Sequence, residues 1–366
     1  MRVLLVSAPL LGHAFPLVPL TLALREAGHD VLVAAGGPAL AVREAGVEVA
    51  DVASGVRLNR AGLRIALTHP RLAKAEAAGA GGLDFVSRLF ATAGEQMSGE
   101  VVSLAGQWKP DLVVHEPLAV AGAIAARHQG VPAAVHDTSL FDSVALTAAI
   151  AARLRLPLPK PAAVLRTTPP SLGTFETPDV RTIPLRPVPY SGKGEVPAWL
   201  AEQPAVPRIL VSRSTVAGPG GGRMMAALAR AAEGVEAEVV LVRPSARLTR
   251  KPLPPNVSAL GWVPIPEVLP TCAAIVHHGG AGTLLAALAA GVPQLIEPGA
   301  GDRAHHARLV SARGAGLSAS ARDVTPELLT RLVTDETVTR AATQVRAEIA
   351  TLPTPTEVAQ QLPHLT

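Results

Sequence analysis

Two histidine-containing turns are the parts of this 366-residue chain whose residue types and spacing could do chemistry. The first is "SAPLLGHAF" at 7–15, in which His13 follows an apolar run typical of a buried strand. The second is "VHHGGAGT" at 276–283, which follows a similar run and leads into an alanine-rich helical pattern. In open parallel sheets, ligands bind where a strand leads through a turn into a helix. Both turns are therefore candidate parts of a functional site.

In the first turn, His13 lies near the start of a helix, where the helix dipole disfavours the imidazolium form. A neutral imidazole near pH 7 can accept a proton, so His13 is a candidate general base. Glu116, directly after the apolar run "DLVVH" at 111–115, is our first choice for a carboxylate that orients it, and Asp137 is the second. The alternative interpretations are a structural histidine and a surface carboxylate near a helix start.

In the second turn, Gly279, Gly280 and Gly282 would let the backbone approach a ligand closely. The helix that follows would offer unpaired N–H groups to an anion, and Thr283 can either cap that helix or donate its hydroxyl to the anion. The spacing matches neither a P-loop nor a dinucleotide fingerprint. We expect a phosphate or pyrophosphate here. The alternative is a tight turn with one buried histidine, and metal binding by the two histidines is disfavoured because successive strand residues point to opposite faces.

The elements that must position these turns alternate between apolar runs and helical patterns. The predicted strands lie at 2–8, 29–36, 47–52, 111–115 and 132–137, and then at 208–214, 237–244, 257–264, 273–280 and 293–299. This alternation of predicted strands and helices predicts an α/β fold with two tandem Rossmann-like domains.

The segments in which this alternation of strands and helices stops predict the domain organisation. We expect a first domain over 1–190, a linker over 191–207, a second domain over 208–350 and a tail helix over 351–366. Residues 53–82 show little periodicity and are interpreted as an irregular lid, and a Pro-rich tract covers 156–190.

The composition disfavours several classes of protein. Hydrophobic residues make up 48% of the chain and charged residues 17%, which is typical of a globular protein, and aromatic residues are scarce at 2%. The net charge of +4 comes from scattered basic residues and not from the clustered face of a nucleic-acid-binding protein. The single cysteine, Cys272, permits no intrachain disulfide, and no uncharged run is as long as a membrane span. We expect a cytoplasmic protein that binds neither nucleic acid nor membrane, with a homodimer left open.

Together, these residues resemble the GT-B glycosyltransferases of bacteria that decorate polyketides and other antibiotics. The resemblance extends over nearly the whole chain and rests on the Gly12-His13 pair, "LGWVPIPEVLPTCAAIVHHGGAGT" at 260–283, "AGVPQL" at 290–295 and the "LPTP" of the tail. It implies two Rossmann-like domains that face each other across a cleft. The first would bind a small hydrophobic acceptor and the second a nucleoside-diphosphate sugar, and the tail helix would return to the first domain.

The resemblance also implies roles for individual residues. His13 would deprotonate an acceptor hydroxyl, Glu116 would orient His13, and the acceptor oxygen would displace the diphosphate with inversion at the anomeric carbon. The residues that match the nucleotide and diphosphate site are Thr215, Trp262, Val263, His278, Gly279, Gly280, Gly282 and Thr283. The candidates for binding the acceptor or the sugar are Gly12, Phe85, Phe90, Phe141, Asp302 and Arg303.

Several positions depart from the family pattern. Leu10 and Ser214 stand where glycine is common, and Arg303 replaces the glutamine of a sugar-binding Asp-Gln pair. Ala286 stands where relatives that use UDP often have a glutamate that binds the ribose hydroxyls. A thymidine nucleotide lacks the 2′-hydroxyl, so we expect a dTDP-deoxysugar as donor.

No cofactor is expected apart from this donor. The chain contains no Asp-x-Asp sequence. We therefore expect the helix dipole, backbone N–H groups and His278 to stabilise the leaving diphosphate without a metal.

Two other hypotheses stay open at this point. A sugar-nucleotide epimerase would need the same fold but no acceptor. A catalytically silent homologue that assists a transferase would be consistent with Leu10 in the first turn. A dehydrogenase is disfavoured because neither turn has the dinucleotide spacing.

Overall fold

The structure is a computed structural model that describes residues 1–173, 179–215 and 222–366. The chain forms two compact units. The first unit comprises Met1–Thr168, Thr174–Val188 and Thr351–Thr366, and the second comprises Pro169–Gly173 and Pro189–Ala350.

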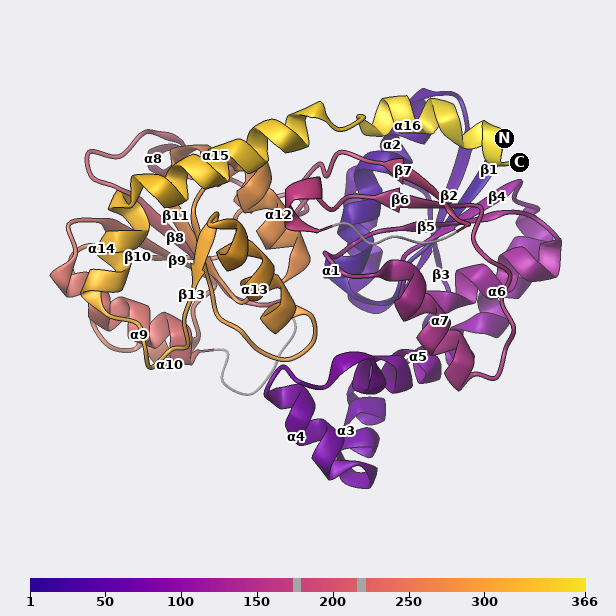
Figure 1. Cartoon of the computed structure of the whole chain (residues 1–366), viewed down its shortest axis with the longest axis horizontal. Coiled ribbons are helices and arrows are strands. Elements are labelled where there is room, and N and C mark those ends of the chain that lie inside the picture. Colours follow the sequence, from indigo (N-terminus) through magenta and orange to yellow (C-terminus); the bar gives the residue numbers. More distant parts are fainter. Residues whose placement is uncertain (174–178, 216–221) are drawn as a thin grey trace. The chain divides into compact units, whose positions relative to one another are not determined.

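The first unit is built on seven parallel strands in the order β3-β2-β1-β4-β5-β6-β7 (Figure 1). These strands are β1 (Arg2–Val6), β2 (Asp30–Ala35), β3 (Val49–Asp51), β4 (Leu112–His115), β5 (Ala133–His136), β6 (Ala163–Arg166) and β7 (Arg181–Pro184). The central strands are buried on both faces, as their unbroken Val, Leu and Ala runs predict. The strand order reverses at β1, which pairs with both β2 and β4.

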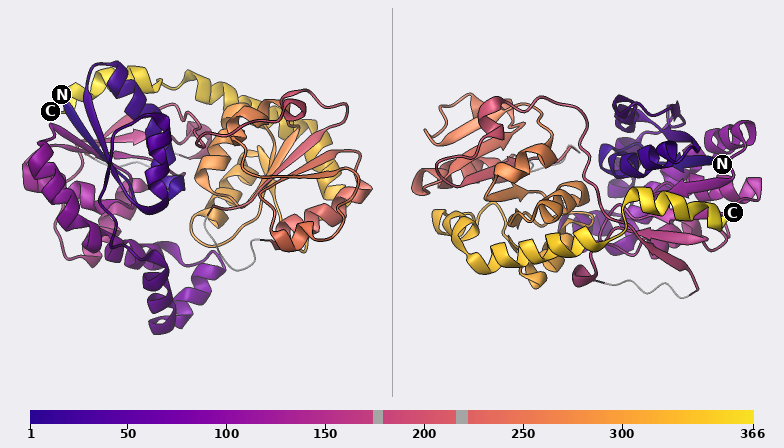
Figure 2. Two further views of the ribbon diagram at one scale, coloured as in Figure 1. Left: turned by 180° about the vertical axis from the view of Figure 1, so that it is seen from behind. Right: turned by 90° about the horizontal axis from the view of Figure 1, so that it is seen from above.

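Helices flank both faces of this sheet (Figure 2). They are α1 (Leu11–Ala14), α2 (Val18–Glu26), α3 (Leu58–Thr68), α4 (Pro70–Ala77), α5 (Gly82–Trp108), α6 (Val120–Gln129), α7 (Ser143–Arg153) and α16 (Pro355–Gln361). The core between sheet and helices is aliphatic and rich in alanine, which fits the scarcity of aromatic residues.

The second unit repeats this plan with six parallel strands in the order β10-β9-β8-β11-β12-β13. Its strands are β8 (Arg208–Ser212), β9 (Glu238–Val242), β10 (Val257–Leu260), β11 (Ala274–His277), β12 (Gln294–Ile296) and β13 (Gly316–Ser318). Its helices are α8 (Ala198–Ala201), α9 (Arg223–Ala231), α10 (Ala246–Thr249), α11 (Ile265–Val268), α12 (Ala281–Ala290), α13 (Arg303–Arg313), α14 (Pro326–Thr334) and α15 (Glu336–Thr351). The strand order again reverses at the first strand of the unit, β8.

The structure corrects the prediction that residues 53–82 are irregular, whereas their role as a lid stays a prediction. Most of this segment forms the helices α3 and α4. α3 buries only Ile65 and leaves Leu63 and Leu67 exposed, while α4 buries no residue.

Three short strands were not predicted. β6 and β7 lie in the Pro-rich tract at 156–190, of which residues 174–178 lie outside the described part of the chain, and β13 has only three residues. β7 ends in Pro184 and is an edge strand, where a missing N–H donor is tolerated.

The end of the chain packs on the first unit. Thr354 and Glu357 form a reciprocal capping box that begins α16 directly after the Pro353 break. α16 packs against α2, and the two termini lie close together on this unit (Figure 2). Among the described residues, no helix has both the length and the apolar character needed to cross a membrane.

Gly122 in α6 provides a test of the close packing between helix and sheet. A Cβ at this position would lie 2.7 Å from Cβ of His115 and 3.0 Å from Cβ of Val6, which belong to two rigid strands. We expect Gly122→Ala to lower the free energy of unfolding by about 1–3 kcal/mol. Gly99→Ala, on the exposed side of α5 where a Cβ meets nothing within 4 Å, should instead raise it by about 0.5–1 kcal/mol. Urea unfolding would measure both, and equal effects of the two variants would contradict this packing argument.

Candidate active site

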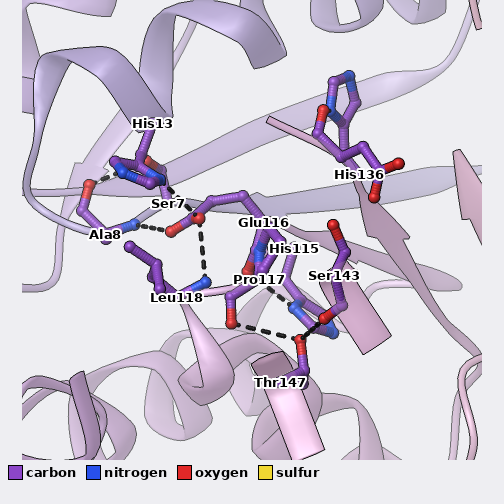
Figure 3. A network of polar contacts seen from close by, with 11 residues as sticks. Ser7, Ala8, His13, His115, Glu116, Pro117, Leu118, His136, Ser143 and Thr147 are labelled. Atoms are coloured by element: carbon purple, nitrogen blue, oxygen red, sulfur yellow. Dashed lines mark hydrogen bonds and ion pairs between the residues drawn. The ribbon is translucent and has the colours of Figure 1, made fainter. Parts of the chain in front are cut away.

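The first-unit turn brings His13 and Glu116 together (Figure 3). Nδ1 of His13 lies 2.9 Å from Oε2 of Glu116, and the two side chains are 26% and 0% exposed. The pairing of β1 with β4 explains this contact, because Val6 is opposite His115 and the loops after both strands leave the same edge. The predicted pairing of the histidine with Glu116 is therefore present.

Backbone donors hold the Glu116 carboxylate in place. Oε1 accepts the N–H of Ala8 at 2.9 Å, and Oε2 accepts the N–H of Leu118 at 3.0 Å. Since both oxygens already accept hydrogen bonds, the group acts as a carboxylate and Nδ1 of His13 is the donor between them. Nε2 of His13 then carries the lone pair, which is the form that a general base requires.

The loop that carries Glu116 is itself anchored. His115 donates from Nδ1 to the carbonyl of Glu116 at 3.1 Å, and the hydroxyl of Thr147 in α7 lies 3.3 Å from the carbonyl oxygen of Pro117 (Figure 3). These contacts link the loop after β4 to α7.

The alternative carboxylates have other partners. Asp137 is fully buried beside Arg166, with Oδ2 3.3 Å from Nε, and burial raises its pKa to about 7 despite this cation. Asp111, at the opposite end of β4, accepts the N–H of Arg2. Neither of them replaces Glu116 beside His13.

Phe90 of α5 lies beside His13, with 6.4 Å between the ring centroids. Phe85 and Phe141 are half-buried, at the start of α5 and just before α7, and a Cβ at Gly12 would meet no atom within 4 Å. Phe90 therefore lies next to the candidate base.

Leu10 does not distort the first turn. Its backbone is extended, with φ −134° and ψ 134°, a conformation that any residue adopts. Its N–H bonds to the carbonyl of Ala8 at 2.7 Å, and its side chain packs in the cluster that contains Phe90. The departure from glycine at this position is therefore compatible with an intact His13–Glu116 pair.

In the second unit, the backbone of the turn requires glycine at position 279, and the ring of His278 lies against Gly280. Gly279 has φ +82°, which favours glycine. A Cβ on Gly280 would lie 2.5 Å from Nε2 of His278, so the imidazole ring covers this residue. Gly282 is exposed, with open space around it.

The two adjacent histidines have different environments. His277 is buried, accepts the N–H of Gly279 at Nδ1 and bonds to Oε1 of Gln294 through Nε2 at 2.8 Å. His278 is turned at 89° to it, and its buried Nδ1 has no hydrogen-bond partner in the described chain. Burial lowers the pKa of His277 to about 4, and burial together with the nearby Arg303 cation lowers that of His278 to about 3. Both rings are neutral at pH 7.

The first turn of α12 presents backbone donors beside His278. The first helical bond here runs from the N–H of Leu284 to the carbonyl of Gly280, so the N–H groups of the three preceding residues have no partner within the helix. The N-cap is Gly280 without a side-chain cap, so the alternative in which Thr283 caps the helix is wrong. These donors and the positive end of the helix dipole suit an anion.

Trp262 and Val263 follow β10. Trp262 is 37% exposed, and the guanidinium of Arg243 lies 5.0 Å from its ring centroid. Val263 is buried in the core, so only its backbone could meet a nucleobase. Thr215 is exposed in the loop after β8.

Asp302 and Arg303 begin α13 next to the glycine turn. His306, buried on the same helix, donates from Nδ1 to the carbonyl of Gly279 at 2.7 Å, and its Nε2 lies 3.5 Å from Oδ2 of Asp302. Nη2 of Arg303 lies 3.4 Å from the hydroxyl of Ser214. Sequence reasoning missed His306, although its spacing of four residues from Asp302 on a helix was a usable signal.

No group of three or more His, Cys, Asp or Glu side chains suited to a metal ion occurs in the described ranges.

Comparisons with known proteins agree with this architecture. Family models for the N-terminal and C-terminal domains of erythromycin biosynthesis protein CIII-like proteins match residues 22–214 and 224–365. The elloramycin glycosyltransferase ElmGT of Streptomyces olivaceus is 37% identical over 99% of this chain and 97% of its own length. The solved glycosyltransferase SnogD from Streptomyces nogalater is 33% identical with a TM-score of 0.80, covering 100% of this chain and 99% of its own. SsfS6 from Streptomyces sp. SF2575, complexed with thymidine diphosphate, is 29% identical with a TM-score of 0.80 at the same coverage.

Two parallel-sheet units with these relatives define the class as GT-B glycosyltransferases, so the chain is an enzyme that transfers a sugar. Within that class it belongs to the erythromycin biosynthesis protein CIII-like family.

The neutral His277 predicts that the second unit is sensitive to acid. The unfolded chain protonates this histidine near its ordinary pKa of 6.5, whereas the folded chain does so only near 4. Its contribution to stability is therefore fully present above pH 6.5 and is lost as the pH falls towards 4. From pH 7 to pH 4.5 we expect this residue alone to lower the free energy of unfolding by about 2–3 kcal/mol.

Urea unfolding of the wild type, His277→Gln and His128→Gln at both pH values checks this expectation. His128 is exposed near the end of α6. The loss of stability in acid should be smaller for His277→Gln and unchanged for His128→Gln. An equal loss in all three proteins would show that the neutral state of His277 is unimportant.

Proposed function

We propose that this enzyme transfers a deoxysugar from a dTDP-sugar to a hydroxyl of a small hydrophobic natural product, with inversion, and that His13 is the general base. The observation that carries the proposal is the bond between His13 and a Glu116 carboxylate whose oxygens both accept backbone N–H groups.

In the proposed reaction, Nε2 of His13 takes the proton of the acceptor hydroxyl as the acceptor oxygen attacks the anomeric carbon. The new carbon–oxygen bond forms on the face opposite the diphosphate. The bond from the anomeric carbon to the diphosphate oxygen breaks, and its electron pair leaves with the diphosphate. Glu116 stabilises the imidazolium that results, because it is a carboxylate that already contacts Nδ1.

The acceptor environment that we propose is apolar. Phe90 lies beside His13, and the surrounding cluster includes Leu10, Leu118 and Val120. The name of ElmGT, an elloramycin glycosyltransferase, supports an acceptor of natural-product type. Phe85, Phe141 and Gly12 remain our candidates for further contacts with it.

The donor that we propose is a dTDP-deoxysugar in the second unit. The N-terminus of α12, with Gly280, Gly282 and Thr283, would bind the diphosphate, and Trp262 would contact the base. The structure of SsfS6 complexed with thymidine diphosphate supports a thymidine nucleotide. Ala286 supports it too, since this residue is buried in the core and offers no acceptor for a 2′-hydroxyl.

The proposed roles of His13 and Glu116 predict a selective loss of catalysis. His13→Ala should lower kcat about 10²- to 10⁴-fold while leaving the affinity for dTDP unchanged. Glu116→Gln should also lower kcat, because an amide does not stabilise the imidazolium. Steady-state kinetics with a donor and acceptor pair turned over by the wild type, combined with calorimetry for dTDP, would measure these effects.

His128→Ala is the matched control, since it removes an exposed histidine of the same unit. Full activity of His13→Ala would rule out the base role. Activity without any acceptor would instead support the epimerase hypothesis, and binding of dTDP without turnover of any sugar would support the silent homologue.

The donor assignment predicts that dTDP binds more tightly than UDP, and that NAD does not bind. UDP must leave its 2′-hydroxyl without the hydrogen-bond partner that a glutamate at position 286 would supply. Calorimetric titrations in one buffer, with and without EDTA, would measure the affinities. Equal affinity for UDP would contradict the argument from Ala286 but not the transfer of a sugar. A loss of binding and activity in EDTA would contradict the proposed independence from metal.

A further inference from the structure

Four arginines gather at the carboxyl edge of the second sheet. They are Arg213 after β8, Arg223 at the start of α9, Arg243 after β9 and Arg303 at the start of α13. In the described part of the chain, none of the four forms an ion pair with a carboxylate. The carboxylates nearby are Glu297 and Asp302.

Arg303 is the arginine closest to the glycine turn. Its backbone and Cβ pack against Gly279, where an added Cβ would lie 3.3 Å from its Cα and 3.2 Å from its Cβ. Its guanidinium reaches towards Gly299, and Nη2 lies 3.4 Å from the hydroxyl of Ser214. The side chain is half-buried and extends from α13 to the loop after β8.

The Arg303 guanidinium also acts electrostatically on both neighbouring titratable groups. It is the largest charged influence that lowers the pKa of His278, after burial itself. It also opposes the rise that burial causes in the pKa of Glu297. The cation therefore lies close to His278, whose buried Nδ1 has no hydrogen-bond partner among the described residues.

A neutral His278 cannot supply the positive charge that a diphosphate requires. The N–H groups of α12 contribute partial charges, and the full charges in this region belong to the arginines. A guanidinium offers five donors in a planar fork that matches two phosphate oxygens at once, whereas an amide offers two donors and no charge.

We propose that Arg303 binds the diphosphate of the sugar donor directly, with the hydroxyl of Ser214 as a positioning group that holds the guanidinium. This inference deepens the proposed function and rests on it. Two departures from the family pattern, Ser214 and Arg303, then act as one unit across the turn. When the bond to the anomeric carbon breaks, the diphosphate gains negative charge and Arg303 stabilises it further.

Calorimetry with dTDP, UDP and thymidine tests this assignment on the wild type, Arg303→Gln and Arg303→Lys. We expect Arg303→Gln to weaken dTDP binding about 10- to 100-fold and to leave thymidine binding unchanged, because thymidine carries no phosphate. Arg303→Lys keeps the charge and should bind dTDP with intermediate affinity. The affinity of the wild type for dTDP should also fall more steeply with added KCl than that of Arg303→Gln.

Arg308→Gln is the matched control, because it neutralises an exposed arginine of the same helix. It should bind dTDP like the wild type, and thermal unfolding of all variants would show whether they fold alike. Wild-type affinity of Arg303→Gln for dTDP would overturn the inference and leave the proposed function intact. Equal weakening for dTDP and thymidine would also overturn it, because Arg303 would then shape the site without contacting the diphosphate. If the wild type bound neither dTDP nor UDP, the proposed function itself would fail, and the inference with it.

Discussion

In both units every strand of the sheet runs parallel to its neighbours, so the loops that follow the strands all leave from one edge. The strand order reverses at β1 in the first unit and at β8 in the second. At such a reversal the neighbouring loops lead to opposite faces of the sheet and leave room between them. The first reversal brings the loop after β4, with Glu116, against the turn that carries His13. The second places the loop after β8, with Ser214, beside the glycine turn after β11.

Burial then decides which groups at these edges are charged. Glu116 is fully buried, and two backbone N–H groups and His13 donate hydrogen bonds to it. Burial keeps His277 neutral although its bond to Gln294 opposes this effect, and burial together with the nearby Arg303 cation keeps His278 neutral. His13, His277 and His278 therefore have the same side chain but different environments, and these environments suit them to different chemical roles. Only His13 has a carboxylate at one nitrogen and a partly exposed ring.

Much of the fold could be predicted because long, buried strands of parallel sheets have unbroken apolar runs. β1, β2, β8 and β9 all have this pattern and were predicted. The elements that were missed are two helices with few buried residues and three short strands, two of which lie in the Pro-rich tract. α3 and α4 bury one residue between them, and β6, β7 and β13 have three or four residues each.

The pairing of His13 with Glu116 was predictable for a similar reason, since both follow strands whose ends meet at one edge. The contacts of His306 and Arg303 could not be predicted in this way. Each side chain extends from α13 to a loop that is remote in the chain: His306 to the carbonyl of Gly279, and Arg303 to Ser214, 89 positions away. The spacing of residues within one helix does not predict a contact with a segment so far away in the sequence.

The sequence by itself determined the class of fold, the two turns and the residue types available for chemistry. Tertiary structure decided which of these residues meet and which carry charge. Sequence patterns reflect periodic burial along one element, whereas the protonation state and partner of a side chain depend on every element packed around it. His278 shows this most clearly. Its place in the glycine turn was evident from the sequence, but its neutral ring and its arginine neighbour are consequences of packing between β9, β11 and α13.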